Sequence, residues 1–427
     1  MFNTINNHLI GLLFIFCYIF SFYIVGPITS SLIIALSIII CCGISSIYKG
    51  WLSREIENPF TIKIFFFQFL LIFVGLFYSI IHLSFDYSYI KVLFTQQIHF
   101  IAGIFIVIYL KNRLHVSSID VEKHIVYAFL IQSIIQLVAS VSPSFASVLL
   151  LFSRANELQE AYGGGVRGLA LSSGTGWSLG LSYGLVYIIF VKRFLLYKIG
   201  ILEIIIGILL LAGTFFAGRT GFVGAAIGGL FFILNNRKSF ILKLFLIIKS
   251  IFFIVIFCIF FYLLFPILTN HLIEHVFPFA FEPFYKLAYN DSFSTGSTDT
   301  LLRMWSVPIS FIEIFCGTGY FTDPITDTYF MRVDVGVLRN LFYWGIGGYL
   351  LVIIYQIVLI QPIRYIKEKA STSKYNMILY QCAIILYLFL LELKAMTIGF
   401  NKMTFSIVFL LSYFYFEDYR NSYYNAK

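Results

Sequence analysis

The sequence predicts an all-α polytopic integral membrane protein, and three observations lead to this fold class. Of the 427 residues, 60% are hydrophobic and only 11% are charged, and the mean hydropathy is +0.92. A soluble domain of this size could not cover such a core with so few charges. The apolar residues also gather into runs of about 20, the length that crosses about 30 Å of hydrocarbon. Third, the basic residues lie in the short connections between the runs.

Twelve of these runs are predicted to be transmembrane helices. They are residues 8–26, 28–48, 60–81, 90–110, 124–142, 169–191, 199–217, 220–236, 246–268, 337–360, 376–395 and 402–416. Two runs fit the length and hydrophobicity of a transmembrane helix least well. They are the eighth, which is short and rich in glycine, and the twelfth. No basic segment precedes the first run and the second follows at once, so we expect the first to be a retained span and not a cleaved signal peptide.

Twelve spans put both termini on one side of the membrane, and the basic residues indicate which side. Nineteen of the 29 Lys and Arg residues fall on the side of the termini and ten on the other, which predicts cytoplasmic termini. The expected organisation is nine helices in residues 1–268, a large periplasmic loop at 269–336, three helices in 337–416 and a cytoplasmic tail at 417–427. Because topology accounts for the net charge of +9, no nucleic-acid partner is expected.

Five arginines on the predicted outer side each lie against or inside an apolar element, unlike solvated surface charges. They are Arg167, Arg219, Arg303, Arg332 and Arg339. A guanidinium donates bidentately to phosphate oxygens and stays charged, so several arginines converging from different segments would hold a diphosphate. Alternatively, each one extends to lipid phosphates or pairs with a nearby aspartate. For Arg219 and Arg339 together, the sequence favours a functional role.

Asp334 stands directly before the apolar run DVGVLRNLFYWGIGGYLL, five residues ahead of Arg339. A carboxylate at this place could act as a base that activates a hydroxyl. It could equally be a carboxylate at the N-terminus of the helix, where it would cap free N–H groups and favour the helix dipole. Near the end of the eleventh run, Glu392 and Lys394 flank Leu393, and we expect both charges to face protein or a cavity because lipid disfavours them.

No metal site or cofactor is expected. Asp323 and Asp327 are four apart in a proline-containing loop with no further ligands indicated, and the six scattered cysteines have no metal-ligand spacing. The glycine pairs at 180 and 184 and at 224 and 228 have the GxxxG spacing that lets helices approach closely, which indicates a structural role.

Four stretches of the chain carry a resemblance to a known family. They are VRGLALSSGTGWSLGL around Arg167, AGRTGFVGAAIGG around Arg219, TLLRMW around Arg303, and FCGTGYFTDPITDTYF leading into DVGVLRNLFYWGIGGYLL. The last looks like an Asp-x-Gly-x-x-Arg helix start followed by Gly-Ile-x-Gly. With the late ELK motif, these stretches resemble the O-antigen and capsule repeat-unit polymerases (Wzy-type) and, more distantly, the O-antigen ligases. The resemblance covers most of the chain.

The resemblance implies a GT-C-like glycosyltransferase at the outer face of the bacterial inner membrane. Such an enzyme moves a growing glycan from undecaprenyl diphosphate to the non-reducing end of a new lipid-linked repeat unit, without a metal. The implied partners are the undecaprenyl-diphosphate-linked donor and acceptor, the lipid bilayer and a chain-length-regulating membrane protein.

The resemblance also assigns roles to individual residues. Arg219 and Arg339 would bind the diphosphate and stabilise its developing charge, and Asp334 would be the base or would orient an arginine. Substrate binding is implied for Arg167, Arg303, Arg332, Asp327, Tyr329 and Lys394.

Three other functions stay open. An O-antigen ligase would share the donor, but the histidine expected near Asp334 is absent. A lipid-linked oligosaccharide flippase or other transporter would show charges in several spans, internal symmetry and no large loop. A structural membrane protein without catalysis would leave the outer arginines unexplained.

Overall fold

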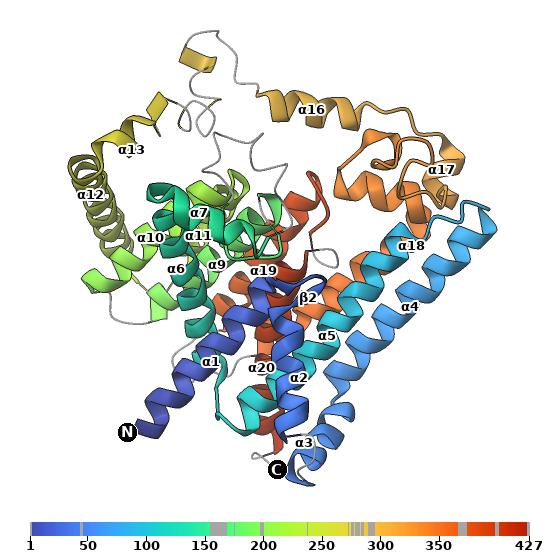
Figure 1. Ribbon diagram of the computed structural model, residues 1–427, viewed down its shortest axis with the longest axis horizontal. Coiled ribbons are helices and arrows are strands. Elements are labelled where there is room, and N and C mark those ends of the chain that lie inside the picture. The colour runs from blue at the N-terminus through green and yellow to red at the C-terminus, as the bar shows by residue number, and fades with distance from the viewer. Residues whose placement is uncertain are drawn as a thin grey trace. The chain divides into compact units, whose positions relative to one another are not determined.

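The computed structural model describes residues 2–42, 46–153, 169–174, 176–196, 200–236, 238–271, 273–274, 277, 282, 286–288, 295–365, 374–397 and 401–424. These residues are almost entirely helical (Figure 1). The exception is an antiparallel hairpin of two short strands, β1 (Tyr23–Val25) and β2 (Ile28–Thr29). The chain divides into two compact units, each built from segments far apart in the sequence.

Unit 1 comprises residues 1–30, 119–295 and 369–387. Besides the hairpin, its elements are α1 (Phe2–Phe20), α6 (Ser118–Val141), α7 (Pro143–Leu150), α9 (Trp177–Leu196), α10 (Ile201–Ala217), α11 (Thr220–Leu234), α12 (Phe240–Leu264), α13 (Pro266–His271) and most of α19 (Lys374–Glu392).

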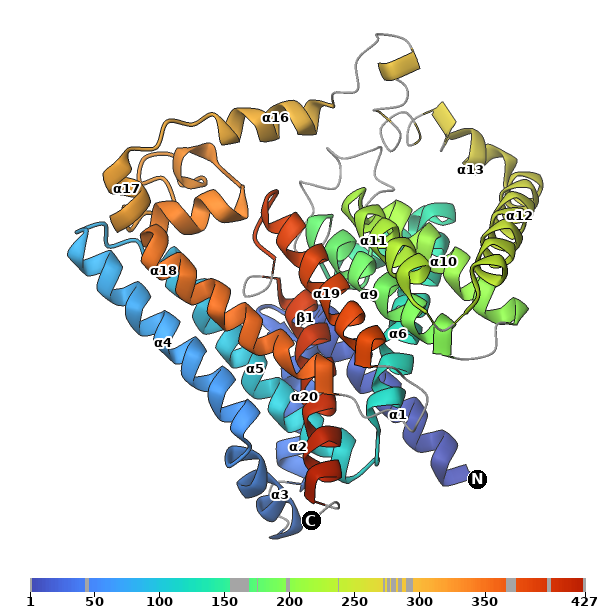
Figure 2. The ribbon, with the colours of Figure 1, turned by 180° about the vertical axis from the view of Figure 1, so that it is seen from behind.

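Unit 2 comprises residues 31–118, 296–368 and 388–427. Its elements are α2 (Ser30–Cys42), α3 (Ser46–Ile56), α4 (Pro59–Ile81), α5 (Ser88–Asn112), α16 (Gly296–Trp305), α17 (Phe311–Cys316), the 3-10 turns η2 (Phe330–Arg332) and η3 (Gln361–Tyr365), α18 (Gly336–Ile360) and α20 (Lys402–Tyr424). Helices α4, α5 and α18 lie side by side in two opposite views (Figures 1 and 2).

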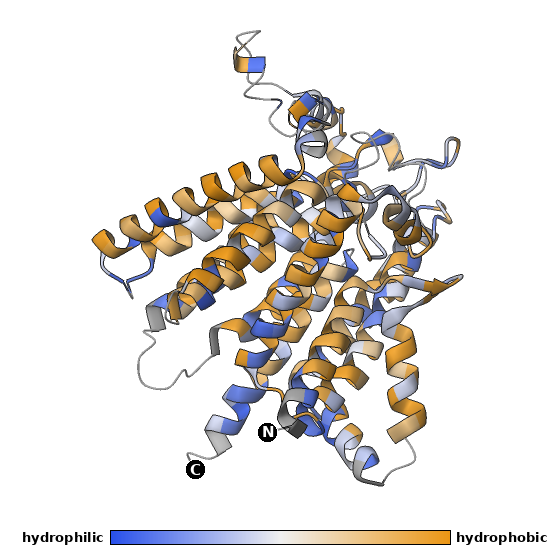
Figure 3. Ribbon diagram, turned by 60° about the vertical axis from the view of Figure 1, so that its left-hand side comes forward, coloured by the Kyte–Doolittle hydropathy of each residue, from blue (hydrophilic) through white to orange (hydrophobic). Residues whose placement is uncertain are grey.

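Apolar side chains run along the helices, and polar residues gather toward the helix ends and connections (Figure 3). Six helices in the described part of the chain are long and apolar enough to cross a membrane: α4, α5, α6, α9, α12, and α18 continued through η3. Five shorter apolar helices lie in α1, α2, α10, α11 and α19. The protein is therefore an all-α membrane protein, as its composition predicts.

The twelve predicted runs each overlap mainly one helix, in order α1, α2, α4, α5, α6, α9, α10, α11, α12, α18, α19 and α20. The second run also reaches the start of α3, and the ninth reaches the start of α13. The predicted end of the first run (residue 26) and the predicted start of the second (residue 28) are wrong, because residues 23–29 form the hairpin. The reason is the Gly26–Pro27 turn. Gly26 has a φ of +53°, a left-handed conformation that glycine adopts without strain, and proline cannot continue a helix. Of the predicted loop at 269–336, the described residues 295–336 contain the helices α16 and α17.

In unit 1, glycines bring α9 and α11 into backbone contact, as the GxxxG spacing predicts. A Cβ atom built on Gly224 would meet the backbone Cα, C and O atoms of Gly184. One turn earlier, a Cβ atom on Gly221 would lie 2.9 Å from the carbonyl oxygen of Gly180. Neither helix can yield to a side chain here, because the neighbouring atoms belong to backbone. Close approach of this kind drives helix association in lipid through van der Waals packing.

We expect Gly224→Ala to lower the stability of the protein, because the added methyl group overpacks the contact with Gly184. Overpacking of this kind costs about 1–3 kcal/mol, measurable as a lower thermal unfolding midpoint in detergent. Gly229→Ala on the same helix is the matched control, since a Cβ atom there has no neighbour within 4 Å. Equal midpoints for the two variants would show that the contact is not needed.

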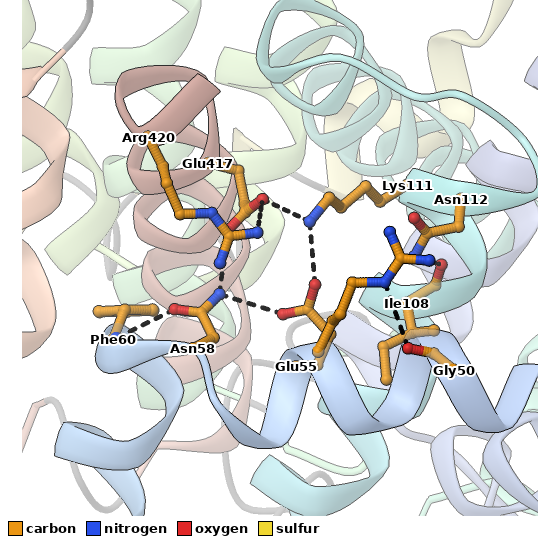
Figure 4. Close-up of polar contacts among 10 residues, drawn as sticks. Gly50, Glu55, Asn58, Phe60, Ile108, Lys111, Asn112, Glu417 and Arg420 are labelled. Carbon is orange, nitrogen blue, oxygen red and sulfur yellow. Dashed lines mark hydrogen bonds and ion pairs between the residues drawn. The ribbon is translucent and has the colours of Figure 1, made fainter. Parts of the chain in front are cut away.

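In unit 2, a buried cluster of charged groups joins the ends of α3, α5 and α20 (Figure 4). Lys111 pairs with Glu55 at 2.9 Å and also with Glu417. The side-chain amide of Asn58 donates to both carboxylates at 3.0 Å, and Arg420 donates to Glu417 at 2.9 Å. Two positive and two negative charges therefore balance. Asn58 also caps α4, since its Oδ1 accepts from the N–H of Phe60 at 3.0 Å.

We expect Lys111→Met to destabilise the protein strongly, because it leaves Glu55 and Glu417 buried with one compensating cation too few. Removal of one partner from a buried ion pair costs about 3–5 kcal/mol. The control is Lys63→Met on α4, where the lysine side chain is exposed. Chemical unfolding in detergent micelles measures the free energy of unfolding of both variants. If Lys111→Met lowers it no more than Lys63→Met does, the cluster does not stabilise the protein.

Candidate functional site

Arg339 lies in the first turn of α18 and is 8% exposed. Its guanidinium carbon is 3.9 Å from the centre of the Phe321 ring and 4.0 Å from that of Tyr329. Aromatic faces attract a guanidinium, more strongly where water is excluded. The described residues offer no hydrogen-bond partner to its buried Nε atom. The Nε–H donor of the guanidinium is thus without a hydrogen-bond partner among the described residues, while the rings of Phe321 and Tyr329 pack against the group.

Asp334 is the carboxylate partner of Arg339. Nη1 of Arg339 donates to Oδ1 of Asp334 at 3.2 Å, while the carboxylate side chain stays 43% exposed. Loss of water around it raises the pKa of the Asp334 carboxyl above its usual value, and the positive charges of Arg339 and Lys394 act in the opposite direction. Asp334 therefore combines access to solvent with a greater affinity for a proton than an ordinary surface aspartate has.

The start of α18 explains how two residues five apart can pair. Val335, in extended conformation, precedes the helix and makes no side-chain cap, so Asp334 lies outside the helix. From there its side chain reaches Arg339, which the helical spacing alone did not predict. The alternative that Asp334 caps the helix is wrong. The N–H of Arg339 instead bonds to the carbonyl of Val335 at 2.9 Å.

A loop anchored at both sides holds Phe321 against Arg339. Oδ2 of Asp86, between α4 and α5, accepts from the N–H groups of Phe321 and Thr322 at 2.7 and 2.6 Å. On the α18 side, the N–H of Thr318 donates to the carbonyl of Phe342 at 2.6 Å, and that of Gly319 donates to Tyr343 at 3.2 Å. Gly319 has a φ of +71°, which suits glycine.

A second polar layer lies beneath the start of α18. Glu392, 2% exposed at the end of α19, accepts from the N–H and Oγ1 of Thr397 at 2.8 and 2.5 Å. It also accepts from the side-chain amide of Asn340 at 3.3 Å, and Tyr89 donates to Oδ1 of Asn340 at 2.7 Å. The expectation that Glu392 faces protein is thus confirmed.

Gly336 lets these layers meet. A Cβ atom at this position would lie 2.8 Å from the backbone C and O atoms of Ala395 and 2.8 Å from Oε1 of Glu392. The close approach of the segment after α19 therefore explains why a glycine stands at this position of the Asp-x-Gly-x-x-Arg stretch. This approach also brings Lys394 near Asp334.

The predicted site residues fall into three groups. The structure brings together Arg339, Asp334, Tyr329 and Lys394 in unit 2. Arg303 on α16 is exposed and donates to Oγ1 of Thr300 at 3.0 Å, and Arg332 is exposed. Asp327 is exposed in the turn that Asp323 forms by accepting from the N–H groups of Ile325 and Thr326 at 3.0 and 2.9 Å.

The other two predicted arginines lie in unit 1 or outside the described residues. Arg219 belongs to unit 1, where it precedes α11 and pairs with Glu282 at 3.2 Å. Pairing with a nearby carboxylate is the alternative that the sequence left open for each arginine. Arg167 lies outside the described residues.

Sequence reasoning missed three residues that build the site: Phe321, Asp86 and Asn340. Phe321 is one of 50 phenylalanines, and nothing in the sequence singles it out. Asp86 is one of few carboxylates on the predicted outer side, which was the one signal that could have drawn attention to it. In the described part of the chain, no three His, Cys, Asp or Glu side chains are grouped as metal ligands.

Comparison of the chain with protein-family models, with curated proteins and with solved structures yields no match. The chemistry of the site therefore rests on its own residues. A half-exposed carboxylate can take a proton, a buried guanidinium with a spare donor can hold an oxyanion, and the exposed ring of Tyr329 can pack against a ligand. Asp334 and Tyr329 each lie within contact distance of Arg339.

We expect Gly336→Ala to destabilise the start of α18, because the new methyl group would collide with backbone atoms of Ala395. The expected cost is about 1–3 kcal/mol, seen as a lower unfolding midpoint. Gly347→Ala on the same helix is the control, since a Cβ atom there has open space. If both variants unfold at the same temperature, Gly336 has no packing role.

Proposed function

We propose that this protein is a metal-independent membrane glycosyltransferase of the polysaccharide-polymerase type. It would transfer a growing glycan from undecaprenyl diphosphate to the non-reducing end of a new lipid-linked repeat unit. The observation that carries the proposal is the buried guanidinium of Arg339, flanked by two aromatic rings and paired with a half-exposed carboxylate. The resemblance of DVGVLRNLFYWGIGGYLL to the polymerase family supplies the sugar chemistry.

Arg339 fits the charge that develops on the leaving group. When a glycan leaves a diphosphate, negative charge grows on the phosphate oxygens, and prearranged donors stabilise it. The unsatisfied Nε is such a donor, and bidentate contact with phosphate is the usual mode for arginine. Tyr329 is 48% exposed whereas Phe321 is 9% exposed. Tyr329 is thus the ring that can move aside or stack on a sugar.

Asp334 fits the role of the base. The acceptor is a sugar hydroxyl, which must lose its proton as the new bond forms. A carboxylate with a raised pKa that remains open to solvent can receive this proton. The ion pair with Arg339 also couples departure of the diphosphate to proton transfer from the acceptor. A phosphate that draws the guanidinium away weakens the ion pair and leaves Asp334 more basic.

The two ends of unit 2 support the proposed topology. Tyr89 and Lys111 mark polar clusters at opposite ends of α5, and 22 residues at 1.5 Å each separate them by about 33 Å, close to the thickness of the hydrocarbon core. We propose twelve spans in the bacterial inner membrane. Both termini and the Lys111 cluster would be cytoplasmic, and the Arg339 site would face the periplasm.

The deciding experiment is a gel of surface glycan from cells that lack this gene. Loss of the polymer ladder, with single repeat units attached to the lipid core, would support a polymerase. Complete loss of glycan from the core, with lipid-linked polymer accumulating, would indicate a ligase. Lipid-linked units trapped on the inner face would indicate a flippase.

We expect Arg339→Lys to reduce polymer formation at least tenfold, because lysine loses the planar fork and the stacking on Phe321 and Tyr329. Loss of one charge-assisted hydrogen bond costs about 1.5–3 kcal/mol, which is roughly a 10- to 100-fold rate effect. The measurement is polymer yield per unit of protein in complemented cells. The control is Arg113→Lys, an exposed arginine on the proposed cytoplasmic side, and equal yields from both variants would refute the role of Arg339.

We expect Asp334→Asn to slow transfer about 10²- to 10⁴-fold, the usual contribution of a general base. Because the base must be deprotonated, activity of the unchanged protein should fall as the pH drops through the pKa of Asp334. Since that pKa is raised, the acid limb should lie above the usual range of an aspartate. Purified protein in lipid nanodiscs, assayed across pH, tests both points. The control is Asp299→Asn, an exposed carboxylate on α16, which should keep full activity.

A further inference from the structure

One face of α17 is apolar and uncovered. Phe311, Ile312 and Phe315 are 75%, 73% and 50% exposed. These residues lie at positions i, i+1 and i+4 and therefore share one side of the helix. The one ionisable group on the helix besides Cys316 is Glu313, whose carboxylate accepts from the N–H of Ser310 at 2.7 Å in a capping box. The acidic group is thus used to start the helix.

The structure fixes α17 so that this face cannot turn inward. Its last residue, Cys316, accepts a hydrogen bond through its carbonyl from Nε2 of His82 at 2.9 Å. Next along the chain, a Cβ atom on Gly317 would lie 2.6 Å from the N–H of Gly345 and from the carbonyl of Tyr343. Gly345, with a φ of +63°, marks a break in α18 into which this corner fits. Helix α17 is thereby held against the Ile81 end of α4 and against α18.

The uncovered face continues an apolar row on α4. Every fourth residue of that helix is exposed and large, in the order Phe65, Phe69, Phe73, Phe77 and Ile81. As α4 is long and apolar enough to cross a membrane, this exposed row would meet lipid in a spanning helix.

The segment after α4 prolongs the same apolar surface. Leu83 and Phe85 are 71% and 58% exposed, and both have a positive φ, a conformation that large side chains rarely adopt. Ser84, between them, donates to the carbonyl of Gly319 at 2.8 Å. Hydrogen bonds from His82 and Ser84 therefore join the end of the exposed row of α4 and this segment to the corner that follows α17.

We propose that α17 lies in the membrane interface, with Phe311, Ile312 and Phe315 inserted among the acyl chains of the leaflet that borders the Arg339 site. The occupant of the face is a lipid surface. A lipid surface fits because the face adjoins the exposed apolar row of α4 and carries no charge of its own. Burial of apolar side chains at this boundary is the usual binding mode of interfacial helices. This proposal requires only that α4 spans the membrane and does not depend on the proposed enzymatic activity.

Ile325 provides a matched control within the same region of the chain. It is 91% exposed, but it lies in the polar turn of Asp323 and Thr326 and away from α17 in sequence. A general tendency of exposed apolar residues to associate with lipid would affect Ile325 as much as Phe311. The proposal predicts a difference between them.

The test places a spin label at each position in turn in a cysteine-free full-length protein, reconstituted in nanodiscs of phosphatidylcholine and phosphatidylglycerol. The variants are Phe311→Cys, Phe315→Cys and Ile325→Cys. We expect labels at 311 and 315 to collide more often with oxygen, which concentrates in lipid, than with a water-soluble nickel complex. The label at 325 should show the reverse. Equal and water-like accessibility at all three positions would overturn the proposal.

A second measurement keeps the native cysteines, in case their removal prevents folding. Photoreactive benzoyl-phenylalanine replaces Phe311, Phe315 or Ile325 in the otherwise unchanged protein in the same nanodiscs. Illumination should give lipid adducts in the intact mass at 311 and 315, and none at 325. Absence of adducts at 311 and 315, or equal adducts at all three positions, would contradict an inserted helix.

Discussion

The compensation of a buried guanidinium is the interaction on which the candidate site depends. Arg339 is largely removed from water, and an uncompensated charge in such a place is costly. Asp334 supplies the opposite charge at 3.2 Å, and the rings of Phe321 and Tyr329 supply the faces on which the cation rests. The Nε atom has no hydrogen-bond partner among the described residues, so the arginine has a donor that an anion could use. A fully satisfied arginine would be a structural element only.

The same constraint shapes the rest of unit 2. Few charges are buried among the described residues of this unit, and they lie near the helix ends with partners, as the Lys111 cluster and Glu392 show. Polar side chains within the bundle, such as Gln68 and Tyr355, bond to one another at 3.0 Å. Between their ends the described helices of unit 2 are mainly apolar, with some buried polar side chains such as Gln96 and His99, which suits a hydrocarbon surrounding. Among the described residues of unit 2, the buried ionised side chains are therefore found near the helix ends.

Glycines determine where helices and loops come close enough to build these arrangements. Gly336 admits the segment after α19 to the start of α18, and Gly345 interrupts α18 where the corner after α17 fits. In unit 1, Gly184 and Gly224 let two helices touch through their backbones. In lipid, where water does not drive helices together, such contacts contribute much of the packing energy. The glycine-rich stretches of the sequence are thus places of close approach.

The sequence by itself determined the membrane class, the helical runs and the helix contact at the GxxxG pairs, since these follow from local composition and spacing. It also pointed to Asp334 and Arg339, because charged residues at the edge of an apolar run stand out. Only the tertiary structure decided that the two pair across five residues, that Phe321 and Asp86 build the site, and that Glu392 lies beneath it. Apart from the Asp334–Arg339 pair, these contacts join segments that lie far apart in the sequence, such as Asp86 and Phe321 or Asn340 and Glu392. Their geometry arises from how the helices pack, which no local pattern encodes.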